Sequence, residues 1–145
     1  MGFDEKFLIG MVHLKPLPGS FRYDGNFGEV VDHAVEEAVK LEEAGFDAVL
    51  IENFRDVPYS KTVDPITVSS MSVIGEEVDR RISIPFGVNV LRNDSVSSYS
   101  IAYSVGADFI RVNVLSGVAF TDQGLIEGSA DELAEVRNKF SDGIS

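Results

Sequence analysis

Residues 85–94, PFGVNVLRND, and residues 108–117, DFIRVNVLSG, decide the fold of this 145-residue chain. Both stretches are rich in Val, Ile and Phe and are typical of buried strands, yet each carries an asparagine in its interior and the second adds an arginine. Successive side chains of a strand point to opposite faces, so the valines share one face and the asparagines the other. Polar groups are costly to bury without partners. We therefore expect the apolar face to pack on helices and the polar face to line a barrel interior that opens into a polar pocket.

Strand and helix patterns alternate along the whole chain. Strands are predicted at residues 7–12, 47–53, 85–91 and 108–115, and helices at 26–45, 64–81, 95–105 and 129–140. Asn26 with Glu29, and Ser129 with Glu132, have the spacing of a capping box at the start of a helix. The order βαβαβαβα implies parallel strands joined by right-handed crossovers.

Two architectures contain such a series: an open doubly wound sheet and a (β/α)8 barrel. The dinucleotide-binding form of the first needs G-x-G-x-x-G after its first strand, whereas this chain has HLKPLPG at 13–19. Four units in 145 residues make about half of a barrel of about 250 residues. We therefore predict an α/β fold of parallel (β/α) units, the N-terminal half of a TIM (β/α)8 barrel, as a single partial domain over residues 1–145. Its unpaired edges, with Leu50 and Leu91 facing water, predict a homo-oligomer.

The composition excludes several classes of protein. Twelve basic against twenty-four acidic residues give a net charge of −12, which argues against a nucleic-acid partner. No apolar run approaches the roughly 20 residues of a transmembrane helix. The acidic start lacks the basic region of a secretory signal, so we expect a cytoplasmic protein, with peripheral membrane association left open.

Polar residues gather late in the predicted strands, which is where barrels carry their active sites. We expect Glu52 to act as a general acid or base, and His13 as a second proton carrier or an electrophile. The residues expected to hold oxygen atoms of a small-molecule ligand are Asn53, Asn89, Arg92, Asn93, Arg111 and Asn113. No spacing predicts a metal site, and the cofactor stays open.

Structural roles are the alternative for the same residues. Arg111 and Glu52 could form an internal ion pair, and the two strand asparagines could bind only loop backbone. Asp94 is expected to cap the third helix. The direction of His13 stays ambiguous, because it lies where the first strand becomes a loop.

Four stretches together resemble the BtpA family: IGMVHLKPLPGS (9–20), ENFRDVPYSK (52–61), FGVNVLRND (86–94) and FIRVNVLSGVAFTDQGLIEG (109–128). The resemblance implies a (β/α)8 barrel in a family named after a factor linked to photosystem I biogenesis. It also implies that the chain is similar to the N-terminal half of proteins nearly twice its length. The family brings no settled reaction, so the residue roles rest on their chemistry.

Two functions follow from these features. The first is an enzyme, a lyase, isomerase or hydrolase, acting on a small polar or phosphorylated metabolite. The second is a non-catalytic assembly factor for a membrane complex, as the family name suggests. Such a factor needs an exposed apolar or basic docking surface, which the acidic sequence does not display, so the clustered polar residues favour the enzyme.

Overall fold

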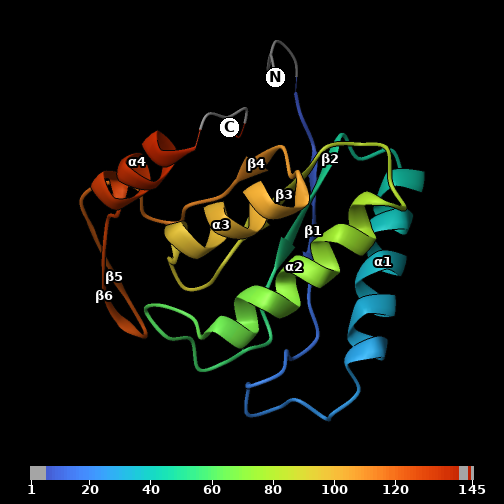
Figure 1. Cartoon of the computed structure of the whole chain (residues 1–145), viewed down its shortest axis with the longest axis horizontal. Coiled ribbons are helices and arrows are strands. Elements are labelled where there is room, and N and C mark those ends of the chain that lie inside the picture. Colours follow the sequence, from blue (N-terminus) through green and yellow to red (C-terminus); the bar gives the residue numbers. More distant parts are fainter. Residues whose placement is uncertain (1–5, 141–143, 145) are drawn as a thin grey trace.

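The computed structural model describes residues 6–140 and residue 144, and its elements alternate as the sequence predicts (Figure 1). The strands and helices are β1 (Ile9–His13), α1 (Phe27–Glu43), β2 (Ala48–Glu52), α2 (Pro65–Asp79), β3 (Phe86–Asn89), α3 (Ser95–Val105), β4 (Phe109–Ile110), β5 (Val118–Thr121), β6 (Gly124–Glu127) and α4 (Ala130–Lys139).

The first four strands form one parallel sheet in the order β1-β2-β3-β4. A doubly wound sheet would reverse its strand order at a switch point, whereas here each strand lies beside its predecessor. Each helix contacts the next one along the chain, and α1, α2 and α3 lie on one side of the sheet (Figure 1). The parallel (β/α) units are therefore arranged as in half of a TIM barrel.

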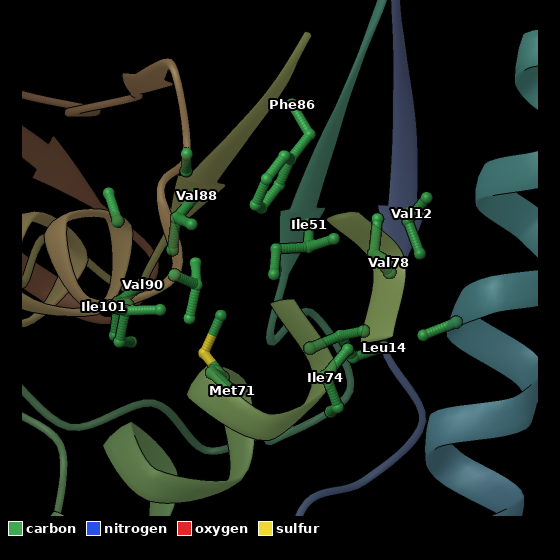
Figure 2. Packing of buried hydrophobic residues seen from close by; sticks show 14 of the residues in the cluster. Val12, Leu14, Ile51, Met71, Ile74, Val78, Phe86, Val88, Val90 and Ile101 are labelled. Atoms are coloured by element: carbon green, nitrogen blue, oxygen red, sulfur yellow. The ribbon is translucent and has the colours of Figure 1, made fainter. Parts of the chain in front are cut away.

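A core of aliphatic side chains joins the sheet to the helices. Val12, Ile51 and Val88 come from successive strands and are fully buried, and they meet Met71 and Ile74 of α2 (Figure 2). Burying an aliphatic side chain of this size stabilises the fold by about 1.5–3 kcal/mol. The alternation predicted for the strands is confirmed, because the odd-numbered face of β2 and the even-numbered face of β3 both belong to this core.

Two of the predicted helix starts are capped by a side chain, and a third is not. The Asn26 side chain accepts a hydrogen bond from the Glu29 backbone N–H at 3.2 Å, and the Asp94 carboxylate accepts one from the Ser97 N–H at 3.0 Å. The capping box predicted at Ser129 is wrong, since that side chain makes no capping bond. Its hydroxyl is instead 2.7 Å from the hydroxyl of Ser95, so it links α4 to the start of α3.

The fourth strand is shorter than predicted, and the long loop after it contains a hairpin. β4 covers two residues rather than eight, and β5 pairs antiparallel with β6. Among residues 6–140, β4 has a strand neighbour on one side only. The Arg111 N–H still donates to the Val88 carbonyl of β3 at 3.0 Å. Further along, a side chain holds the backbone: the Asn93 amide accepts from the Val114 N–H at 2.9 Å and donates to the Val114 carbonyl at 3.0 Å.

The expectation that Leu50 and Leu91 meet water is wrong. Leu50 is 2% exposed and Leu91 is 8% exposed. Pairing places Leu50, Gly87 and Phe109 in one row across the inner face of the sheet. A methyl group added at Gly87 would lie 2.3 Å from the Phe109 ring, so that ring lies directly over the glycine. The missing side chain of Gly87 gives room for an aromatic cover on the inner face.

The edges of the sheet lead to a prediction about association. β1 and β4 each have one strand neighbour in the described part of the chain, and unpaired parallel edges recruit further chains. We expect the 145-residue chain to sediment as a dimer or larger species. A monodisperse monomer with a sharp thermal transition would show that four βα units are self-sufficient and would contradict this prediction.

Candidate functional site at the carboxyl ends of the strands

Three polar side chains stand in one row where the first three strands end. Strand pairing aligns His13 with Glu52 and Glu52 with Asn89. Glu52 is 4% exposed and Asn89 is 1% exposed. All three belong to the inner face, opposite the face that packs on the helices. Alternation places them there, and the parallel register brings them to the same end.

A chain of hydrogen bonds extends this row to the segment after β4. The Asn89 side-chain amide donates to Glu52 Oε1 at 2.9 Å and to Asn113 Oδ1 at 3.2 Å. Asn113 in turn donates to the carbonyl oxygen of Arg92 at 2.7 Å. The strand positions predict that Glu52, Asn89, Arg111 and Asn113 converge at one end of the sheet. The structure confirms this for Glu52, Asn89 and Asn113, which are joined by hydrogen bonds. The alternative in which both asparagines bind only loop backbone is wrong, because their side chains bind each other.

The direction of His13 follows from its neighbours in β1. A methyl group added at Gly10 would meet the Leu41 side chain of α1 at 2.8 Å, and Val12 lies in the helix-side core. Strand alternation then sends His13 to the inner face, where its Nε2 lies 3.6 Å from Glu52 Oε2. The imidazole and the carboxylate thus form a contact across two adjacent strands.

Glu52 is set up as a carboxyl group that holds its proton more strongly than usual. Burial raises the pKa of Glu52, while the charges of Arg111 and His13 and the hydrogen bond from Asn89 act in the opposite direction. The removal of a charged carboxylate from water favours the neutral acid. A raised pKa brings this carboxyl closer to the range in which it can exchange a proton near neutral pH.

Arg111 is exposed and does not form the ion pair considered for it. The ion pair of Glu52 in the described residues is with His13, and Arg111 acts on the carboxylate only through its charge. β4 ends at Ile110, and the Arg111 backbone N–H still donates to the Val88 carbonyl of β3 at 3.0 Å. The exposure of Arg111 leaves its guanidinium donors accessible to solvent.

The remaining predicted ligand residues use their side chains to hold loops. Asn53 accepts from the Leu91 N–H at 2.7 Å, and Arg92 donates to the Gln123 carbonyl at 2.6 Å. Asn93 bridges Val114 and the carbonyl of Glu127. These three residues fix the shape of the site's border, and their contact with a ligand stays a prediction.

Two aromatic residues that were not predicted also belong to the site. The Phe54 ring stacks on the His13 imidazole with centroids 4.1 Å apart and planes 12° apart. The Tyr59 hydroxyl donates to the Phe54 carbonyl. Burial raises the pKa of Tyr59, and the charges of Glu52 and Asp56 raise it further. In the sequence, the place of Phe54 in the site was indicated only by its position two residues after Glu52, the last residue of β2.

Two cavities are lined by residues of the loops that follow the strands. One, of about 420 Å³, is lined by Arg92 and Asn93, by Lys61 of the loop between β2 and α2, and by residues at the start of α4. The other, of about 240 Å³, is lined by Asn53, Tyr59 and other residues of the loops after β1 and β2. Neither cavity is lined by His13, Glu52, Asn89 or Asn113.

Sequence comparison identifies the family. The model of the BtpA family matches residues 4–145. The chain belongs to the BtpA family. An uncharacterized protein of Methanocaldococcus jannaschii is 64% identical over 135 residues, which cover 93% of this chain and 52% of the relative. The photosystem I biogenesis protein BtpA of Synechocystis is 49% identical, over 95% of this chain and 48% of that protein.

The chain spans about half the length of these curated BtpA-family relatives. Among solved structures, the 7,8-dihydropteroate synthase of Vibrio fischeri matches with a TM-score of 0.56 and 23% identity. The match covers 76% of this chain and 38% of the synthase. At this identity the likeness concerns the fold alone, and it agrees with half of a TIM barrel.

The described residues contain neither a cluster of metal-ligating side chains nor a membrane-spanning helix. No group of three or more His, Cys, Asp or Glu side chains is gathered there as a metal site would require. None of the described helices has the length and apolar character needed to cross a bilayer.

The raised pKa of Glu52 predicts that replacing this glutamate makes the fold more stable near neutral pH. A carboxyl group whose pKa is higher in the folded than in the unfolded protein lowers the free energy of unfolding as the pH rises. The loss begins near the pKa of an ordinary glutamate and is complete above the pKa in the folded protein. Glu52→Gln keeps the shape and removes the charge, so it should raise the free energy of unfolding near pH 7. We expect this gain to shrink as the pH falls below about 4. Urea unfolding at several pH values measures both effects.

The matched control for this measurement is Glu43→Gln, because Glu43 is an exposed glutamate at the end of α1. As a change at an exposed position, it should alter the free energy of unfolding near pH 7 by less than about 0.5 kcal/mol. A Glu52→Gln protein that is less stable than the wild type at pH 7 would contradict the prediction. It would indicate that the contact with His13 is a structural ion pair.

Proposed function

We propose that this BtpA-family protein is an enzyme that acts on a small polar or phosphorylated metabolite at the carboxyl ends of its strands. The observation that carries the proposal is the row formed by His13, Glu52, Asn89 and Asn113. Nothing in the packing of a barrel requires a buried carboxyl, an imidazole and two amides in contact. Such groups are expensive to bury, and they are expected where chemistry needs them.

The roles follow from the chemistry of each group. Glu52, with its raised pKa, suits a general acid or base, and His13 beside it suits the second proton transfer. Asn89 and Asn113 can hold a substrate oxygen on which charge develops. The exposed guanidinium of Arg111 supports a substrate with an anionic group. Proton abstraction beside a carbonyl, or hydrolysis, needs no more than this set.

The activity test uses the same substitution under turnover conditions. The chain is incubated with a mixture of phosphorylated and carboxylated metabolites, and NMR spectra of the mixture are followed over time. Where the wild type consumes a component, Glu52→Gln should slow turnover by about 10²–10⁴-fold, the usual contribution of a general acid or base. Equal turnover by Glu52→Gln and by the wild type would remove Glu52 from the mechanism.

A second function is favoured by a specific surface. The Synechocystis relative is a photosystem I biogenesis protein, and an assembly factor needs an exposed apolar docking surface. The β5–β6 hairpin carries Phe120, 87% exposed, and Val118, 54% exposed, which supports this alternative. Flotation with neutral phosphatidylcholine vesicles tests it. If the alternative holds, the wild type floats and Phe120→Ser with Val118→Ser does not. Absence of wild-type binding would contradict membrane association.

A further inference from the structure

We propose that Phe54 is a positioning residue, whose ring keeps the His13 imidazole against Glu52 on the inner face of the sheet. The inference deepens the proposed function and rests on it, because it assigns a residue that holds the proton-transfer pair together. The two rings are nearly parallel, 12° apart, with their centroids at 4.1 Å. Nε2 of the same imidazole lies 3.6 Å from Glu52 Oε2. Phe54 therefore covers one face of the His13 ring, while the edge of that ring contacts the Glu52 carboxylate.

His13 needs such a support because of where it stands. It is the last residue of β1, and its side chain is 39% exposed. The backbone beyond it is fixed, since the Leu14 N–H donates to the Glu52 carbonyl at 2.9 Å. That bond fixes the Cα of His13 but leaves the ring free to rotate towards solvent. The stacked Phe54 ring is the contact that favours the rotamer facing Glu52.

Phe54 is itself held at both of its backbone groups. Its N–H donates to the carbonyl of Glu52 at 2.8 Å, which gives a tight turn directly after β2. Its carbonyl accepts from the hydroxyl of Tyr59. The Phe54 ring is 48% exposed, so burial alone does not account for its position. The Glu52 backbone therefore anchors both the strand that carries His13 and the ring that covers it.

The first readout is the magnetic environment of the His13 ring protons. A parallel aromatic ring shifts the protons beneath it upfield in NMR spectra. Phe54→Leu should abolish this shift for His13, while Phe54→Tyr should retain it. The second histidine of the chain, His33 in α1, should be unaffected by either change. Phe120→Leu, at a ring that is 87% exposed, is the matched control for loss of a surface phenylalanine.

The second readout separates positioning from a general effect on packing. The positive charge of His13 lowers the pKa of Glu52, so displacement of His13 should raise that pKa. The Glu52 carboxyl carbon is titrated by NMR in the wild type, Phe54→Leu, His13→Gln and the double variant. We expect Phe54→Leu to shift the titration upward when His13 is present and to have no further effect in the His13→Gln background.

Each outcome decides the proposal. An equal shift from Phe54→Leu in both backgrounds would show that Phe54 acts through burial of Glu52, and no shift in the wild-type background would show that it does not position His13. Either result overturns the inference. The titration needs no substrate, so the inference can fail while the enzymatic proposal stands. Conversely, the coupling can be observed even if Glu52→Gln leaves turnover unchanged.

Discussion

The parallel register of the first three strands is the constraint on which the site depends. Pairing of His13 with Glu52, and of Glu52 with Asn89, fixes the three side chains at one end and on one face. The sequential strand order keeps the helices on the opposite face, so the inner face is left free for polar groups. A slip of one residue in any strand would send its polar side chain into the apolar core. The fold and the site are therefore specified by the same pairing.

The buried polar row is balanced by internal hydrogen bonds rather than by a strong ion pair. Asn89 is the centre of this arrangement, because its amide group donates to both Glu52 and Asn113. Each such bond contributes about 0.5–1.5 kcal/mol net, whereas an unsatisfied buried group costs about 1–3 kcal/mol. Burial still raises the pKa of Glu52 despite these bonds. The buried environment of Glu52 thus favours the neutral, protonated form of its carboxyl group.

Much of this arrangement could be predicted from alternation and spacing. The bounds of α3 and the helix-side faces of β2 and β3 follow from apolar periodicity, and the convergence of Glu52 with Asn89 follows from parallel strands. The early end of β4 could not be predicted, because its sequence is apolar enough for a full strand, whereas in the fold the Asn93 side chain holds the Val114 backbone in place of a strand partner. The stacking of Phe54 on His13 depends on a turn geometry that no periodicity reveals. Burial of Leu50 was missed for a similar reason, since the aromatic cover over Gly87 comes from a strand 22 positions later.

The central claim is that the strand ends form a binding site for a small polar ligand. Its most direct test is the side-chain amide signals of Asn89 and Asn113 in NMR spectra of the chain, titrated with a mixture of phosphorylated and carboxylated metabolites. The account predicts that a component of the mixture moves both signals together, with one saturation curve. Signals that stay fixed while ligands perturb only residues of the helix-side face would contradict it.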